Sequence, residues 1–115
     1  MDPERRRELE ARLREMREAI RSLDAVRREG SAVVELDQAR TGRLSRMDAL
    51  ALQAMANAGR ERAARELKRI DAALRRIEEG TYGTCAACGE RIAPARLEAQ
   101  PAVTLCLPCA EERER

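Results

Sequence analysis

Residues 81–109 read TYGTCAACGERIAPARLEAQPAVTLCLPC, and this stretch decides the fold because its four cysteines form two close pairs. Cys85 pairs with Cys88 and Cys106 pairs with Cys109, in the spacing C-x₂-C-x₁₇-C-x₂-C. This spacing is typical of a zinc site with four thiolate ligands. Two residues between the cysteines of a pair allow both sulfurs to face one ion at about 2.3 Å. We therefore predict that the four cysteines bind one structural zinc ion, Zn²⁺.

Two disulfides or a redox pair are the alternatives to a zinc site. The first ten residues are charged and lack the apolar segment of a secretory signal peptide, so we expect a cytoplasmic chain whose thiols stay reduced. A thioredoxin-like redox pair needs a βαβ setting, and nothing before Cys85 has the pattern of a strand. A site with four cysteine ligands has no open coordination position, so the expected role of the metal is structural.

The composition favours long helices over a broad globular core. The chain has 115 residues, of which 38% are charged, and Tyr82 is its single aromatic residue. Ala, Arg, Glu and Leu dominate, as they do in coiled coils. The segment after Gly80 holds few apolar residues, so metal binding should supply much of its folding free energy. No stretch is apolar and long enough to cross a bilayer, and we expect a soluble protein.

Two apolar seams predict two long helices. Asp2 and Pro3 form a favourable helix start, with Asp2 as N-cap, and Gly80 is suited to end a helix. Between these points the apolar positions step by three and four residues, which is the a/d pattern of a coiled coil. The first seam is Leu9, Leu13, Met16, Ile20 and Leu23, and the second is Ala63, Leu67, Ile70, Leu74 and Ile77. Two such seams in one chain favour an antiparallel hairpin.

The position of the turn follows from the length of the second helix, which we expect over residues 45–79. If the first helix ended at Gly30, three apolar residues of the second (Leu50, Leu52 and Met55) would lie without cover. We therefore extend the first helix, kinked at Gly30, to about Arg40, with the turn at Thr41-Gly42. The predicted fold class is all-α: an antiparallel two-helix coiled-coil hairpin over residues 1–79 with its tip near 37–48, and a small four-cysteine zinc-finger module over 80–115 with a short C-terminal helix.

Charge and residue types exclude two classes of function. Lys and Arg number 23 and Asp and Glu 21, a formal net charge of +2 without a local basic excess, which argues against a nucleic-acid binder. The arginines should instead pair with glutamates along solvated helix faces. The chain has no histidine, no Gly-rich phosphate loop and no pair of carboxylates set in a cleft. We therefore expect no enzymatic activity.

The segment Gly80-Thr-Tyr-Gly-Thr-Cys-Ala-Ala-Cys-Gly-Glu-Arg-Ile92, followed by Arg96-Leu-Glu-Ala-Gln-Pro101 and Leu105-Cys-Leu-Pro-Cys109, resembles the DksA/TraR family. The resemblance covers roughly residues 78 to 109, and a preceding coiled-coil hairpin agrees with the family's architecture. It implies a bacterial transcription regulator that binds RNA polymerase directly, without contacting DNA. Family members insert the coiled coil into the secondary channel of polymerase and change initiation.

The family's functional positions are only partly matched. Family members carry two aspartates at the tip, and counting back from Cys85 places these positions on Gly42 and Ser45. Ser45 and Asp48 form an S-x-x-D capping box for the second helix. Asp48 therefore has two interpretations, as a helix cap and as a contact with polymerase. The candidate residues for binding the partner at the tip are Asp37, Arg43, Ser45, Arg46 and Asp48.

The resemblance also bears on the alarmone guanosine tetraphosphate, which some members help to bind with three basic residues. Arg69 matches one of these positions, and Gln100 and Ala110 occupy the other two. Two function hypotheses follow from the sequence. The first is a polymerase-binding regulator, and the second is a zinc-capped coiled-coil adaptor or oligomerisation protein. We expect a monomer, with a homodimer as the alternative because an a/d seam can also pair between chains.

Overall fold

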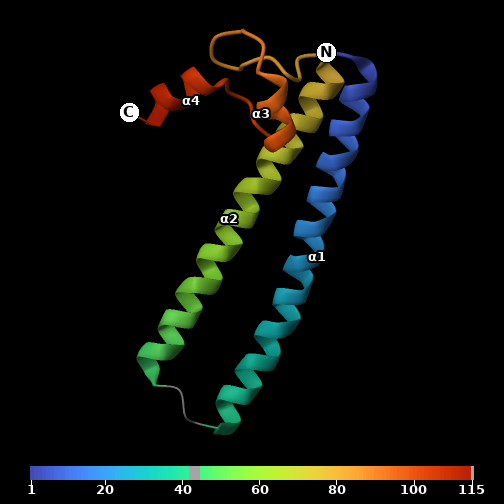
Figure 1. Ribbon diagram of the computed structural model, residues 1–115. Helices are drawn as coiled ribbons and strands as arrows, with labels where there is room; N and C mark the ends of the chain where they lie inside the picture. Colours follow the sequence, from blue (N-terminus) through green and yellow to red (C-terminus); the bar gives the residue numbers. More distant parts are fainter. Residues whose placement is uncertain (42–44, 115) are drawn as a thin grey trace. The chain divides into compact units, whose positions relative to one another are not determined.

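The computed structural model of the chain describes residues 1–41 and 45–114, and the side chains of 1–25 and 45–114. Four helices lie in this part of the chain: α1 (Pro3–Thr41), α2 (Arg46–Glu79), α3 (Pro94–Ala99) and α4 (Leu107–Glu114) (Figure 1). The two long helices pack as an antiparallel hairpin, and the two short ones belong to the cysteine module, residues 80–115. The predicted all-α fold is confirmed. No described helix is both long and apolar enough to span a membrane.

Short polar residues begin the long helices as predicted. The Asp2 carboxylate accepts a hydrogen bond from the backbone N–H of Glu4 at 3.3 Å. The Ser45 hydroxyl oxygen accepts one from the backbone N–H of Asp48 at 3.1 Å and donates to the Asp48 carboxylate at 2.8 Å. The two contacts to backbone N–H groups satisfy donors that have no partner inside the helix. The contact between the Ser45 hydroxyl and the Asp48 carboxylate holds the cap in place. Ser45 therefore caps α2 as predicted, and the Asp48 carboxylate contacts the Ser45 hydroxyl and not the Ser45 backbone N–H of a full capping box.

Gly80 ends α2 in a Schellman motif. Its φ of 80° lies in the left-handed region, which a residue without Cβ adopts at little cost. The backbone N–H of Gly80 donates to the carbonyl of Ile77 at 3.2 Å, and that of Thr81 donates to the carbonyl of Arg76 at 2.9 Å. These are the two hydrogen bonds that define the motif. The chain thus leaves the helix in a fixed direction toward Cys85.

The first helix continues past Gly30 as predicted, but the reason given for it is wrong. Leu50 and Met55 of α2 are 63% and 70% exposed, and Leu52 is also exposed. Leu50 precedes the buried Ile70 by 20 residues, which places the two on nearly opposite faces of an α-helix. The turn predicted at Thr41-Gly42 falls at the edge of the described residues, and Gly42 lies outside them.

The chain divides into two compact units, which are described separately. The tip unit comprises residues 18–66, and the base unit comprises residues 1–17 and 67–115. The predicted boundary between residues 79 and 80 stays a prediction. Every described side chain in the apolar core belongs to the base unit, including the seam residues nearest the cysteine module. The buried residues are Leu9, Leu13, Ile70, Ala73, Leu74, Tyr82, Cys85, Ile92, Leu97, Pro101 and Ala102.

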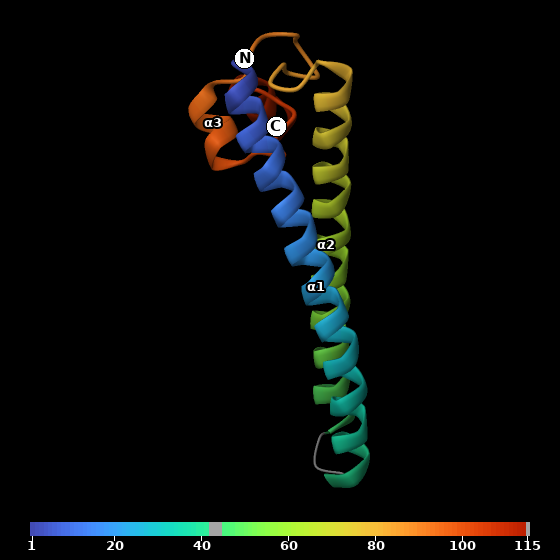
Figure 2. The ribbon, with the colours of Figure 1, turned by 90° about the vertical axis from the view of Figure 1, so that its right-hand side faces the viewer.

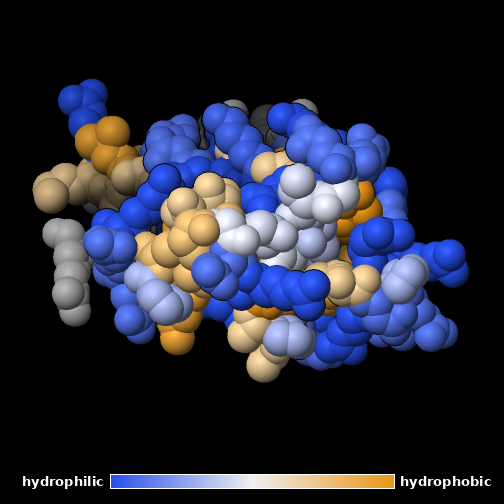
Figure 3. Space-filling model, turned by 90° about the horizontal axis from the view of Figure 1, so that it is seen from above, coloured by the Kyte–Doolittle hydropathy of each residue, from blue (hydrophilic) through white to orange (hydrophobic). Residues whose placement is uncertain are grey.

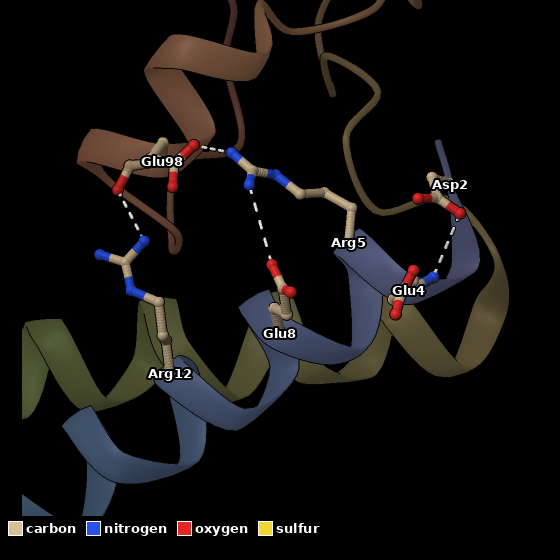
Figure 4. A network of polar contacts seen from close by, with 6 residues as sticks. All are labelled: Asp2, Glu4, Arg5, Glu8, Arg12 and Glu98. Carbon is tan, nitrogen blue, oxygen red and sulfur yellow. Dashed lines mark hydrogen bonds and ion pairs between the residues drawn. The ribbon is translucent and has the colours of Figure 1, made fainter.

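Within the base unit, α3 lies against the first turns of α1 (Figure 2). The Arg12 guanidinium donates to the carbonyl oxygen of Glu98 at 2.8 Å, and Arg5 forms an ion pair with the Glu98 carboxylate (Figure 4). Arg5 also approaches Glu8 at 3.8 Å, and Arg17 approaches Asp71 of α2 at 3.4 Å. Exposed ion pairs of this kind contribute little each, so the buried leucines supply most of the stability of this contact.

The different burial of α2 in the two units predicts different costs of truncation. Ile70→Ala should lower the free energy of unfolding by about 2–5 kcal/mol, because it removes buried methyl groups and leaves a cavity. Leu50→Ala, on the exposed part of the same helix, should change it by no more than about 0.5 kcal/mol. Urea denaturation followed by circular dichroism measures both values. Equal costs for the two substitutions would contradict the exposure of α2 in the tip unit.

Candidate metal centre

The first cysteine pair lies on a tight backbone turn. Thr84 and Arg91 form an isolated antiparallel bridge, and the backbone N–H of Cys85 donates to the carbonyl of Glu90 at 2.7 Å. The backbone N–H of Gly89 donates to the carbonyl of Cys85 at 3.0 Å. Gly89 has a φ of 77°, in the left-handed region. A residue without Cβ takes this conformation readily, and Gly89 supplies it directly after the second cysteine. The turn brings the sulfurs of the first pair to one side.

The second pair lies at the start of α4. Cys106 precedes the helix, its carbonyl accepts the N–H of Ala110 at 3.0 Å, and Cys109 lies in the first turn. Pro108 suits this place because its missing N–H would have no partner inside the helix. The backbone N–H of Ala86 donates to the carbonyl of Thr104 at 2.8 Å. This hydrogen bond joins the two turns and brings the cysteine pairs together.

The four sulfur atoms form one compact cluster. The ligand atoms of Cys85, Cys88, Cys106 and Cys109 all lie within 4.8 Å of one another. The Sγ atoms of Cys88 and Cys106 are 3.7 Å apart, close to the edge of about 3.8 Å that a tetrahedron with Zn–S bonds of about 2.3 Å requires. Four thiolates in this arrangement fit one structural Zn²⁺ and leave no position for a substrate.

The electrostatics of the cluster also suit a cation. Backbone N–H groups of Cys106 and Cys88 donate to the Cys85 sulfur and lower the pKa of this thiol to about 6. Hydrogen bonds among the sulfurs, first of all with Cys106, raise the pKa of Cys109. The sulfurs therefore compete for protons, and a divalent cation stabilises all four thiolates at once. Cys85 is buried and Cys88 is exposed, so the cluster lies close to the surface.

The face around the first pair is made of small residues. Figure 3 looks down on the end that carries the cysteine module in Figure 1, and apolar and near-neutral residues gather at its centre with hydrophilic residues around them. Ala86, Ala87 and Gly89 are exposed beside Cys88.

Three long side chains hold the loops of the module, and the sequence analysis missed all three. The buried hydroxyl of Tyr82 donates to the carbonyl of Pro101 at 2.7 Å, across 19 residues. The guanidinium of Arg76 donates to the carbonyls of Thr81 and Thr84, and Arg96 Nε donates to the carbonyl of Leu105 at 3.0 Å. These carbonyls lie in irregular loops, where no helix or sheet supplies a partner. The single aromatic residue three positions before the first cysteine was the one sequence signal available for this role.

The other described candidate residues lie on or next to the long helices in sequence, outside the cysteine module. Ser45, Arg46 and Asp48 are exposed at the start of α2, in the tip unit. Asp37 lies on the helical backbone of α1, and its side chain falls outside the described ones, while Arg43 lies wholly outside the described residues. Arg69 is exposed on α2 in the base unit. The structure brings Ser45 and Asp48 together as a cap, and the functional role of every tip residue stays a prediction.

Comparison with known proteins agrees with the resemblance. Residues 80–115 match the model of the prokaryotic DksA/TraR C4-type zinc finger. The RNA polymerase-binding transcription factor DksA of Caulobacter vibrioides is 46% identical over 56 residues, which are 49% of this chain and 39% of that protein. The chain therefore matches less than half the length of this curated relative. The relative is a transcription factor, in agreement with the expectation that the chain is not an enzyme.

Two solved structures share the fold over nearly the whole chain. The transcription factor DksA2 of Pseudomonas aeruginosa is 28% identical, with a TM-score of 0.67, and the alignment covers 99% of this chain and 86% of that one. The RNA polymerase binding protein and transcriptional regulator Dks of Chlamydia trachomatis is 24% identical, with a TM-score of 0.62, over 99% and 92% of the two chains. The second likeness shows the fold alone.

Tyr82 reports on the metal centre. Burial raises its pKa to about 12 from the ordinary 10, and nearby Arg12 lowers it slightly. Below pH 10 the phenol is neutral in both folded and unfolded chains, and between pH 10 and about 12 only the unfolded chain loses the proton, so stability should fall as pH rises through this window. Removing zinc should free the loops and return the pKa toward 10.

The measurement is an ultraviolet titration of the phenolate in zinc-loaded and chelated protein, which is unambiguous because Tyr82 is the single aromatic residue. Adding back one equivalent of zinc per chain is the control and should restore the raised pKa. The same pKa with and without zinc would show that the Tyr82–Pro101 contact does not depend on the metal.

Proposed function

We propose, from the match of residues 80–115 to the prokaryotic DksA/TraR C4-type zinc finger, that the chain is a bacterial transcription regulator that binds RNA polymerase directly. The observation that carries the proposal is the likeness to DksA2 of Pseudomonas aeruginosa, a transcription factor, over 99% of the chain. The Caulobacter relative, which matches 49% of the chain, is named for binding RNA polymerase. The chain would act in the cytoplasm, where its cysteines stay reduced.

We propose that the hairpin enters the secondary channel of polymerase and changes initiation from there. An α-helix with its side chains is about 10–12 Å wide, so a pair of helices is narrow enough for a channel that excludes a globular domain. The 34 residues of α2 span about 50 Å. The metal centre has no open coordination position, which supports a structural role for zinc in this activity.

We propose that polymerase, and not DNA, is the direct partner. The net charge of +2 arises from 23 basic and 21 acidic residues. In the base unit several arginines already pair with protein groups, among them Arg5, Arg12 and Arg17. A DNA-binding face needs free cations to neutralise phosphates.

The tip residues are proposed contacts with polymerase, and Asp48 is the one that the chain allows us to test most sharply. Its carboxylate accepts the Ser45 hydroxyl at 2.8 Å and is otherwise exposed. It could therefore serve as cap, as contact or as both. Asp37, Arg43 and Arg46 complete the proposed contact set from the two sides of the turn.

Alarmone binding in the manner of the family is not proposed for this chain. Arg69 is exposed on α2 and already interacts within the protein. Gln100 and Ala110, which occupy the two other family positions, are uncharged. Recognition of several phosphate groups needs more than one cation, so guanosine tetraphosphate should add little to the effect of this protein on transcription.

An adaptor or oligomerisation protein is the alternative, and the exposed apolar residues of α2 favour it. Met47, Leu50 and Met55 are 80%, 63% and 70% exposed. Side chains of this kind can pair between chains or bind another helix. A regulator is the better-supported function, because the likeness to a transcription factor extends over 99% of the chain.

The first test compares polymerase with DNA. The zinc-loaded chain should co-purify with core RNA polymerase and change promoter-complex lifetime, and it should not retard a promoter fragment in the absence of polymerase. Solution mass should correspond to one chain. Tight binding to free DNA that weakens steeply with salt would reverse the proposal, because that slope counts neutralised phosphates. A stable dimer without polymerase binding would favour the adaptor.

The second test separates charge from capping at the tip with a matched pair of variants. Asp48→Asn removes the charge but keeps an oxygen that accepts the Ser45 hydroxyl, so it should abolish the transcriptional effect with little change in melting temperature or polymerase affinity. Ser45→Ala keeps the charge and removes the cap, so it should cost about 0.5–2 kcal/mol of stability and retain the effect. If Asp48→Asn instead lowered the melting temperature and kept the transcriptional effect, Asp48 would have a capping role alone.

A further inference from the structure

A cleft of about 440 Å³ lies within the base unit, apart from the cysteine cluster. It is lined by the start of α1, by residues 82–84 and 91–92 of the cysteine module, and by Pro94 and Leu97 of α3. Its volume falls in the range of small-molecule sites. All of its lining belongs to one compact unit, so the shape of the cleft is defined by that unit alone.

The cleft has an apolar lining. Four of its residues are almost fully buried, and they come from three different segments: Leu9, Tyr82, Ile92 and Leu97. The phenol oxygen of Tyr82 is already satisfied by Pro101, so its ring and not its hydroxyl is available to a ligand. A hydrocarbon body is the ligand part that such a lining stabilises, by about 0.8 kcal/mol for each buried CH₂ group.

The charged groups of the cleft differ in what they already bind. The Asp2 carboxylate accepts the backbone N–H of Glu4. The Arg5 guanidinium forms ion pairs with Glu98 and Glu8. The Arg91 side chain is exposed and makes no hydrogen bond or ion pair with any residue that the structure describes. The cleft therefore combines an apolar interior with one guanidinium that has no partner in the described chain.

We propose that this cleft binds a small amphiphilic carboxylate, such as a medium-chain alkanoate, with its hydrocarbon body on the apolar lining and its carboxylate on Arg91. A guanidinium donates two parallel hydrogen bonds to a carboxylate, which a neutral or cationic head group does not accept equally well. Arg5 is already paired with Glu98, so Arg91 is the cation of the described lining that a ligand carboxylate can bind without displacing an ion pair. The proposal is independent of polymerase binding.

The test titrates octanoate into the zinc-loaded full chain and follows backbone amide shifts by NMR. Octan-1-ol and octylamine share the body and differ in the head group, and hexanoate shares the head group and lacks two methylenes. Octanoate should bind about tenfold tighter than octan-1-ol, the gain expected from a charge-assisted pair. Hexanoate should bind more weakly by about fourfold per missing methylene. The largest shifts should fall on residues 82–84 and 91–97.

Arg91→Gln should lower octanoate affinity to that of octan-1-ol and leave octan-1-ol binding unchanged. Arg75→Gln is the matched control, because Arg75 is an exposed arginine of the same unit that does not line the cleft, and it should change neither affinity. Octylamine binding as tightly as octanoate would overturn the proposal. So would unchanged octanoate affinity in Arg91→Gln, shifts spread over the whole chain, or no shift in the cleft at about 10 mM octanoate.

Discussion

The convergence of four thiolates on one ion is the constraint on which the rest of the base unit depends. Seventeen residues separate the two cysteine pairs, and this segment is irregular apart from the short helix α3. In loops of this kind no helix or sheet pairs the backbone carbonyls. Side chains of Arg76, Tyr82 and Arg96 donate hydrogen bonds to several of these carbonyls instead. These three side chains hydrogen-bond to backbone carbonyls that lie within four residues of a cysteine or in the segment between the two cysteine pairs.

The module does not form its core alone, because the ends of the long helices complete it. Leu9 and Leu13 of α1 and Ile70 and Leu74 of α2 are buried in the same unit as Ile92 and Leu97. Arg12 adds a contact from α1 to the backbone of α3. The base is therefore one compact unit made from both ends of the sequence. In the tip unit, by contrast, the large apolar residues at the start of α2 are exposed.

This division separates the residues that hold the structure from those proposed to act on a partner. The cysteines, Tyr82 and the buried leucines lie in the base unit, and the proposed tip contacts lie in the tip unit. Among the tip residues whose side chains are described, Ser45 and Asp48 combine a structural contact with a proposed function. Substitutions elsewhere at the tip should therefore change function without a large change in stability, whereas those in the base change both.

The sequence by itself determined the helix ends and the metal ligands. The Ser45 cap predicts the start of α2 and Gly80 predicts its end, because both depend on neighbours within a few residues. The metal ligands were predictable for another reason, since C-x₂-C pairs at this separation are typical of a four-thiolate zinc site. Only the tertiary structure decided which seam residues are buried, and it left Leu50 exposed while burying Ile70. It also joined Tyr82 to Pro101 and opened the cleft beside Arg91. Such contacts join residues far apart in the chain, and the periodicity of apolar residues does not predict them.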